Sequence, residues 1–391
     1  MNTTASVAPT ASHNQPIQPG LDLLLVVAVL LLLGLGLVMV YSASIAIAES
    51  KFGEGNSHYF LVRQVLYILA GIAVGNACFR IPLRWWQTYS HYLLGFGILL
   101  LVVVLVPGIS HEINGSRRWL SLVIFNFQPS ELMKLFILIF TADYVVRKAA
   151  FKDHFFKGFL PILALLTVVS LLLLMEPDLG ATVVIAAIVL SVMFMNGMNW
   201  KMFLGLVCLV PVLIALLIII EPYRMDRINA IFDPWNDPFN KGYQLTHALI
   251  AFGLGEWWGV GLGNSVEKLN YLPEAHTDFM FAVLAEELGF AGVVAVISLF
   301  FLLLVRIFKV GRMAAKLGNQ FGSLVAQGIG VWLGLQAFIN MGVNMGLLPT
   351  KGLTLPFMSY GGSSIVINCI AIAILLRIDW ENRLKRRGVH V

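Results

Sequence analysis

The sequence is poor in charge and in cysteine. Of its 391 residues only 12% are charged and 59% are apolar, whereas a soluble domain has about 25% charged and about 45–50% apolar residues. This composition argues against a soluble enzyme, and also against a nucleic-acid-binding protein despite the net charge of +5. Cys78, Cys208 and Cys369 lie in apolar runs without CxxC spacing. We therefore expect buried packing residues rather than a disulfide framework or a zinc site.

Long apolar runs are what the sequence has instead. About 20 helical residues cross the hydrocarbon core of a bilayer. The runs predict an all-α polytopic membrane protein with ten transmembrane helices, at 22–45, 61–79, 90–107, 131–147, 159–175, 179–195, 202–220, 279–305, 323–347 and 360–378. The first run is longer than the apolar region of a signal peptide, so it is predicted to be retained.

The basic residues predict the orientation. With the N-terminus in the cytoplasm, most of the 26 Lys and Arg residues fall on short inside loops and the last tail. The positive-inside rule then places both termini in the cytoplasm. Residues 1–20 are predicted to be a disordered tail, 21–379 the transmembrane domain and 380–391 a basic tail.

One large extracytoplasmic loop, residues 221–278, joins the seventh and eighth predicted helices. It contains Trp235, Trp257 and Trp258 and an amphipathic stretch at 243–253. We expect short helices at the membrane interface, anchored by the Trp side chains.

Polar residues at apolar depth are the informative ones, since each is costly unless it is paired or hydrated. Arg117 and Arg118 lie outside, against the positive-inside trend, and guanidinium groups suit phosphate or carboxylate oxygens. Trp119 beside them could stack on a sugar. The alternative is a contact with anionic lipid headgroups. Glu131 and Lys134 are three residues apart and could pair with each other instead of serving a site.

A second cluster lies where the large loop enters the eighth helix, in the sequence LPEAHTDF at 272–279. Asp278 could cap that helix. Capping does not explain why Glu274 and His276 crowd the same turn, and a carboxylate at a half-hydrated position is also a plausible general base.

Two further pairs of acidic residues lie in or beside the predicted helices. Glu286 and Glu287, deeper in the eighth helix, must meet cations such as Lys134 or be protonated, and a structural tie between helices is favoured. Glu176 and Asp178 fit a turn with a helix cap. Lys351 and the serine- and glycine-rich run at 359–364, which includes Ser363, extend the outer polar rim.

These features fit a protein that handles a phosphorylated, membrane-anchored substrate at the outer surface. They leave chemistry and transport open. The sequence also resembles the SEDS family (shape, elongation, division and sporulation), especially its cell-division type. The resemblance covers nearly all of 20–380 and rests on the motifs at 114–119, 128–134, 176–180, 242–244, 272–279 and 356–364.

The resemblance implies a peptidoglycan glycosyltransferase that polymerises lipid II with inversion, forming β-1,4 links and releasing undecaprenyl pyrophosphate. It implies that Asp278 is the catalytic base. The cations expected to stabilise the leaving pyrophosphate are Arg117, Arg118, Lys134 and Lys351, with Trp119 shaping the site. The residues expected to support them are Glu131, His276, Glu286, Glu287 and Ser363.

The resemblance also implies partners and a location. The partners are lipid II, the nascent glycan strand, a class B penicillin-binding protein (the transpeptidase) and other division-complex membrane proteins. The location is the bacterial inner membrane at the division septum. No cofactor is firmly implied, and a divalent cation such as Mg2+ is the one candidate. A lipid II flippase and a non-catalytic division scaffold remain the alternatives.

Overall fold

The computed structural model describes residues 20–388 apart from 54, 109, 114–115, 122–125, 152–153, 210–231, 241 and 350–351. Its long apolar segments are helical, because a helix satisfies its own backbone hydrogen bonds in lipid. The α-helices are α1 (Leu23–Phe52), α2 (Tyr59–Arg80), α3 (Leu83–Thr88), α4 (Ser90–Leu105), α5 (Pro129–Arg147), α6 (Leu160–Met175), α7 (Leu179–Met195), α10 (Tyr243–Gly255), α11 (Met280–Lys316), α12 (Gln320–Asn344) and α13 (Gly362–Arg386). Two short helices, η1 (Ala149–Phe151) and η2 (Phe155–Phe159), precede α6.

In the described part of the chain, six helices are long and apolar enough to cross a membrane, namely α1, α2, Phe156–Met175, α11, α12 and α13. Three shorter apolar helices are α4, α7 and Trp200–Leu209. A helix lies at each of the ten predicted positions, although the end of the seventh falls outside the described residues. The prediction of a polytopic helical membrane protein is thus confirmed at this coarser level.

The expectation of an all-α chain was wrong in one respect. A three-stranded antiparallel sheet joins α4 to α5, in the order β1 (Ser110–Ile113), β2 (Ser116–Ser121) and β3 (Asn126–Phe127). In its register His111 pairs with Trp119 and Leu120 with Phe127. The motif NGSRRW at 114–119 lacks the alternation of apolar and polar residues that predicts a strand. The sheet depends instead on pairing between neighbouring segments of the chain.

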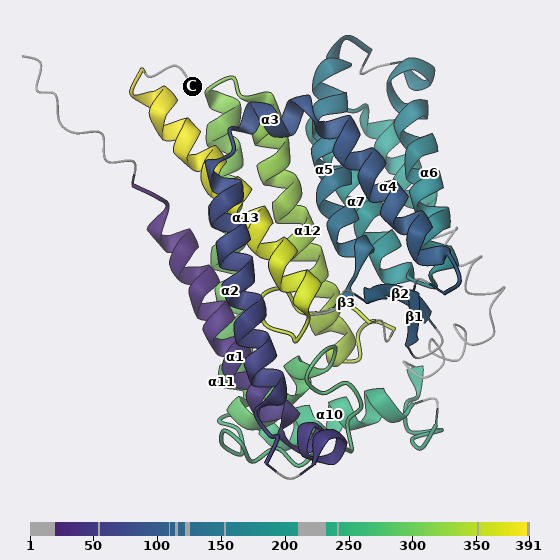
Figure 1. The fold of residues 1–391 in the computed structure, drawn as a ribbon, viewed down its shortest axis with the longest axis vertical. Coiled ribbons are helices and arrows are strands. Elements are labelled where there is room, and N and C mark those ends of the chain that lie inside the picture. The colour runs from purple at the N-terminus through teal and green to yellow at the C-terminus, as the bar shows by residue number, and fades with distance from the viewer. Residues whose placement is uncertain are drawn as a thin grey trace, which may run out of the picture.

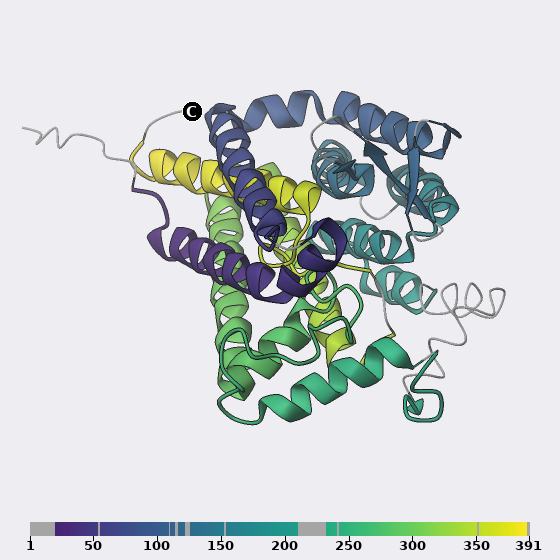
Figure 2. The same cartoon turned by 60° about the horizontal axis from the view of Figure 1, so that its bottom comes forward.

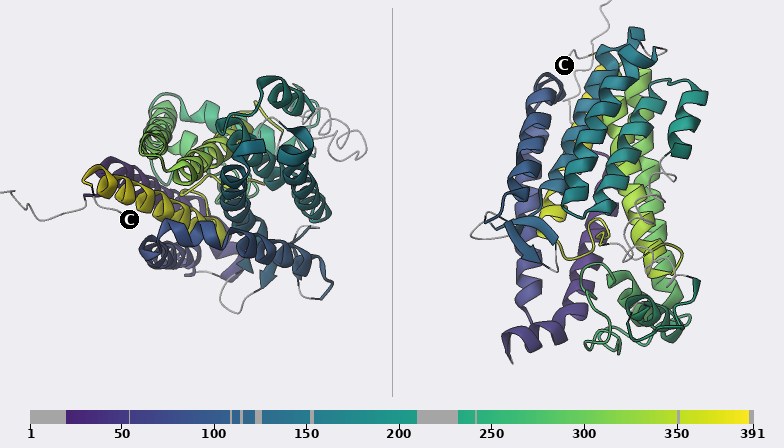
Figure 3. Two further views of the ribbon diagram at one scale, coloured as in Figure 1. Left: turned by 90° about the horizontal axis from the view of Figure 1, so that it is seen from above. Right: turned by 90° about the vertical axis from the view of Figure 1, so that its right-hand side faces the viewer.

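The start of α1 and the end of α13 lie at the same end of the helix bundle, and α10 lies at the opposite end (Figure 1). Figure 2 shows α10 running across that end. The sheet lies beside the ends of α4–α7, while α1 and α2 extend further in the same direction (Figures 1 and 3). Helix α10 covers the amphipathic stretch at 243–253, for which the sequence predicted a helix.

Helix α11 is broken at Gly289, whose backbone has φ +65°. The backbone hydrogen bonds lost at the break are replaced by bonds to the loop after α10: Val260 N to Glu286 O, Gly261 N to Glu287 O, Phe290 N to Glu256 O and Ala291 N to Trp257 O. A Cβ at 289 would lie 2.3 Å from the backbone nitrogen of Gly259, so only glycine allows this approach. The break fastens the large loop to the helix that follows Asp278.

The most enclosed of the six long helices are α12 and α13, while α1, α2 and α11 present many apolar side chains outward. This distribution suits an interior of polar contacts surrounded by a lipid-facing surface. Cys78 and Cys369 are buried as expected, whereas Cys208, on the helix Trp200–Leu209, is exposed and does not fit the expectation.

Candidate active site

Strand β2 brings Arg118 to the turn between α6 and α7. Its Nε donates to the carbonyl of Glu176 at 3.0 Å, and its Nη2 donates to the carbonyl of Pro177. Arg118 and Trp119 are both half-buried. The side chain of Arg117 and the whole of Lys351 lie outside the described part of the chain, so their predicted phosphate contacts stay predictions.

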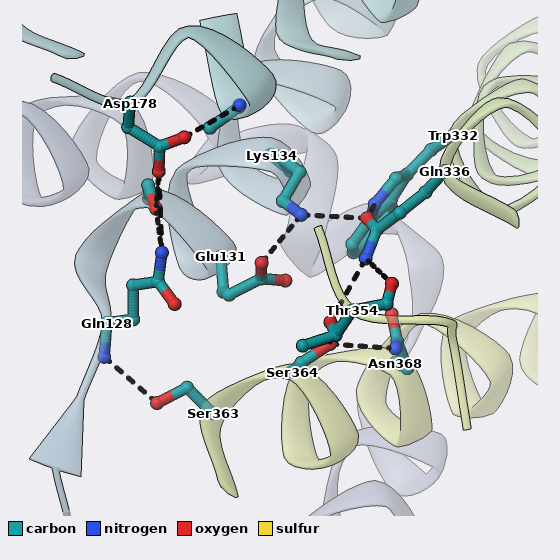
Figure 4. Close-up of polar contacts among 12 residues, drawn as sticks. Gln128, Glu131, Lys134, Asp178, Trp332, Gln336, Thr354, Ser363, Ser364 and Asn368 are labelled. Carbon is teal, nitrogen blue, oxygen red and sulfur yellow. Dashed lines mark hydrogen bonds and ion pairs between the residues drawn. The ribbon is translucent and has the colours of Figure 1, made fainter. Parts of the chain in front are cut away.

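The first residues of α5 join the starts of α7 and α13 (Figure 4). The backbone N–H of Gln128 donates to Ser363 Oγ at 2.9 Å, and Ser130 Oγ donates to Asp178 Oδ2 at 3.2 Å. Asp178 also caps α7, accepting from Ala181 N at 3.0 Å. The predicted cap is confirmed, and Ser363 lies where three helices meet.

One turn into α5, Lys134 is completely buried. Its Nζ lies 2.8 Å from Glu131 Oε1 and 2.8 Å from Gln336 Oε1, and Figure 4 shows it between the two. Trp332 Nε1 donates to the same Gln336 oxygen at 3.0 Å. The pairing of Glu131 with Lys134, one of the two readings of the sequence, is confirmed. The second oxygen of Glu131 is buried and finds no hydrogen-bond partner in the part of the chain that the structure describes.

Gln336 extends this network to α13. Its Nε2 donates to the Thr354 carbonyl at 3.0 Å, Thr354 Oγ1 donates to Ser364 Oγ at 3.1 Å, and Asn368 Nδ2 donates to Ser364 Oγ at 3.3 Å. Sequence reasoning missed Gln336. The signal was present, because Gln336, Asn340 and Asn344 form a polar stripe at i, i+4, i+8 in an apolar helix.

Asp278 is half-buried and lies just before α11. Helix α11 begins at Met280 with Phe279 as its N-cap, so Asp278 does not cap the helix, which was one of the two interpretations of the sequence. The backbone carbonyl of Asp278 accepts hydrogen bonds from Asn340 Nδ2 and Asn344 Nδ2, both at 2.9 Å. Its carboxylate lies against Gly352, where a Cβ would be 3.2 Å from Asp278 Oδ2.

His276 is held two residues upstream. Its ring packs on Phe60 and Tyr360, with ring centroids 4.6 and 5.5 Å away, and its carbonyl accepts from Tyr360 N at 3.0 Å. Burial lowers the pKa of His276 from 6.5 to about 4. The imidazole is thus neutral at neutral pH, which suits support of the loop rather than a cationic role.

Glu286 and Glu287 do not meet Lys134, contrary to one expectation. Glu287 Oε1 lies 2.7 Å from Lys268 Nζ and accepts from Ser42 Oγ at 2.6 Å. Glu286 accepts from Ser265 Oγ and, at 2.7 Å, from the backbone N–H of Val266. The break in α11 turns both acids towards the loop after α10, away from α5. They tie helices and loop together, which is the structural role that the sequence favoured.

Glu176 is completely buried, and neither carboxylate oxygen has a hydrogen-bond partner among the described residues. Burial first, and then the charge of Asp178, raise the pKa of Glu176 from 4.5 to about 9. Between these values the folded protein holds a proton that the unfolded chain has released. Stability therefore falls as pH rises through this window, at up to about 1.4 kcal/mol per pH unit.

We expect Glu176→Gln to remove this pH dependence. Thermal unfolding in detergent, measured at pH 6 and pH 8, should show a larger loss of stability with rising pH for the wild type than for the variant. Parallel pH dependence in the two proteins would contradict the protonated state of Glu176.

Among the described residues, no group of three or more His, Cys, Asp or Glu side chains could hold a metal ion. The divalent cation therefore stays a prediction, and no step below passes through one. What the described side chains offer chemically is a half-buried carboxylate at Asp278 and a sheet beside the ends of α4–α7 that bears Arg118.

Comparisons with known proteins bear on this arrangement. The family model FTSW_RODA_SPOVE, described as cell cycle protein, matches residues 22–384. The chain is 89% identical over 385 residues to the "Probable peptidoglycan glycosyltransferase FtsW" of Nitrosomonas europaea, covering 98% of this chain and 99% of that one. It is 58% identical over 369 residues to the protein of the same name from Aromatoleum aromaticum, covering 94% and 90%.

Solved structures agree in fold. A chain from "Structural coordination of polymerization and crosslinking by a peptidoglycan synthase complex" matches with a TM-score of 0.74 at 30% identity, covering 93% of this chain and 98% of that one. The crystal structure of the rod shape determining protein RodA from Thermus thermophilus matches with a TM-score of 0.66 at 30% identity, with the same coverage.

Proposed function

Because this chain belongs to the cell cycle protein family of FtsW, RodA and SpoVE, we propose that it polymerises lipid II during cell division. It is a peptidoglycan glycosyltransferase, the activity named for its 89%-identical relative. The observation that carries our assignment of the site is the half-buried carboxylate of Asp278, a residue whose backbone carbonyl accepts hydrogen bonds from two buried amides.

In the proposed reaction Asp278 accepts the proton of the 4-hydroxyl of the acceptor GlcNAc. That oxygen forms a bond to C1 of MurNAc on the lipid-linked strand, and the bond from C1 to the pyrophosphate oxygen breaks. Undecaprenyl pyrophosphate leaves with the electron pair. Attack from the opposite face converts the α-linked donor into a β-1,4 product, so no covalent enzyme intermediate is required.

The leaving pyrophosphate gains charge that preorganised cations would stabilise. Arg117, Arg118 and Lys351 remain the candidates for direct contact. Arg118 uses two of its donor nitrogens on backbone carbonyls, which leaves Nη1 for a phosphate oxygen. Lys134 is enclosed and paired, so we assign it to shaping the site between α5 and α12, with Glu131 as its counter-ion.

We propose that ten helices span the inner membrane, with both termini in the cytoplasm and the site at the outer face. The chain is an inner-membrane, multi-pass protein. The support for the finer arrangement is the positive-inside pattern and the position of the start of α1 and the end of α13 at one end of the bundle (Figure 1). Action at the septum is inferred from the division-type relatives.

A class B penicillin-binding protein is the proposed partner. The support is the similarity to a chain solved within a peptidoglycan synthase complex that couples polymerization and crosslinking. Other division-complex membrane proteins are also proposed as partners.

A flippase would need a polar path to the inner side of the membrane. Asp143, near the inner end of α5, is instead neutralised, with Arg147 Nη2 2.7 Å and Ser90 Oγ 2.6 Å from its Oδ2. This pairing favours chemistry at the outer surface over transport.

The test is an assay of the purified chain with lipid II in detergent, with and without the penicillin-binding protein, with glycan products separated by size. We expect polymer from the wild type. Absence of polymer, even with the partner present, would favour the flippase and scaffold alternatives.

A further inference from the structure

The carboxamide of Asn344 lies between the backbone N–H of Ala282 and the backbone carbonyl of Asp278. These two groups would bond to each other if α11 were longer at its start. If α11 began one residue earlier, with Asp278 as its N-cap, Ala282 N would donate to the carbonyl of Asp278, four residues before it. Instead Ala282 N donates to Asn344 Oδ1 at 3.0 Å and to Phe279 O at 3.0 Å, and Asn344 Nδ2 donates to the Asp278 carbonyl at 2.9 Å. The amide thus occupies the place of the first helical hydrogen bond and holds Asp278 outside the helix.

Asn340, one turn earlier on α12, adds a second restraint. Its Nδ2 donates to the carbonyl of Asp278 at 2.9 Å and to the carbonyl of Leu353 at 2.7 Å. This places Gly352 next to Asp278, since a Cβ at 352 would be 3.2 Å from Asp278 Oδ2. Asn340 therefore sets the separation between the carboxylate and the segment that begins at Gly352.

The amide of Asn344 is itself fixed through its oxygen and its nitrogen, and that of Asn340 through its nitrogen. Asn340 and Asn344 are buried, with exposed fractions of 2% and 0%. The Nδ2 of Asn344 also donates to the carbonyl of Asn340 at 2.8 Å, so the oxygen and the nitrogen of its amide are both engaged. A side chain locked in this way transmits its position to the backbone that it binds.

We propose that Asn340 and Asn344 are positioning residues for Asp278, acting through its backbone carbonyl. This rests on the proposed function, in which Asp278 is the base. A general base must lie within hydrogen-bond reach of the proton that it removes, and a misplacement of about 1 Å can cost about 100-fold in rate. Without the amides, Asp278 could join α11, and its side chain would then take a direction set by the helix.

The sharpest variant is Asn344→Asp, which keeps the shape and the acceptor for Ala282 N but puts an oxygen in place of the donor to Asp278. Asn340→Ala is the second. In the full-length chain with its penicillin-binding partner, we expect kcat for lipid II polymerisation to fall at least about tenfold, with KM changed by less than about twofold. A substrate-binding role would raise KM instead.

The matched control is Asn382→Ala on α13. Asn382 is also a buried asparagine whose Nδ2 donates to a backbone carbonyl across helices, that of Val310 at 3.3 Å, but it lies at the opposite end of the bundle. We expect this variant to lose thermal stability without a fall in kcat.

The positioning role would be overturned if the α12 variants lowered kcat no more than Asn382→Ala does at equal loss of stability, or if KM rose while kcat held. It would also be overturned if Asp278→Asn polymerised normally. Failure of the proposed function itself gives a different result, since the wild type would then make no polymer.

Discussion

Asp278→Asn is expected to abolish polymerisation while leaving the fold intact. Asparagine has the same shape, and the bonds from Asn340 and Asn344 go to the backbone carbonyl, which the substitution keeps. What is lost is the ability to accept a proton from the acceptor hydroxyl. General base catalysis contributes about 10²–10⁴-fold, so the rate should fall by at least about 100-fold.

The measurement is glycan chain formation from lipid II by the variant with its partner protein, compared with thermal unfolding and copurification of the partner. Glu274→Gln is a matched control. This carboxylate lies four residues upstream, is exposed and accepts a hydrogen bond from Thr277 Oγ1 at 2.8 Å. We expect near-normal polymer from the control. Normal polymer from Asp278→Asn would remove Asp278 from the chemistry and make Glu131 the next candidate.

Removal of the Lys134 ammonium is expected to lower the free energy of unfolding more than removal of the cation from a solvent-exposed ion pair. Lys134→Met would leave Glu131 buried beside α12 with its only ion-pair partner in the described structure gone. Breaking one side of a buried ion pair costs about 3–5 kcal/mol. Replacing both charges in the double variant Lys134→Met with Glu131→Gln should recover most of this, because no uncompensated charge remains.

Unfolding in detergent of the two single variants and the double variant measures this coupling. The control is Arg383→Met on α13, whose partner Asp379 lies 2.8 Å away, four residues earlier, and whose side chain is 35% exposed. A pair that is partly open to solvent is worth about 0–1 kcal/mol. A Lys134→Met loss no larger than that of Arg383→Met would contradict a charge-balanced interior at this point.

Helix α12 supplies the three amides that hold the buried polar groups in place. Gln336 meets Lys134, Asn340 meets Asp278 and Leu353, and Asn344 meets Asp278 and the first turn of α11. Helix α12 is enclosed by its neighbours and carries these amides at helical spacing. It is the element through which the ion pair of α5 and the carboxylate before α11 are kept in one arrangement.

Hydropathy determined the helical positions, because apolar runs of bilayer length allow little else. Local chemistry likewise determined the cap by Asp178 and the pairing of Glu131 with Lys134, since each involves residues within one turn. These are short-range effects, and they can be read along the chain. The SEDS-like motifs added the activity, which agrees with the family match over 22–384.

Only the tertiary structure decided which distant residues meet. Lys268 rather than Lys134 neutralises Glu287, because the break at Gly289 turns this part of α11 towards the loop after α10. Asp278 is held by α12 amides some 60 positions later in the chain rather than capping its own helix. Such contacts depend on how helices pack across the bundle, and a hydropathy pattern specifies which face of a helix is polar but not which partner that face finds.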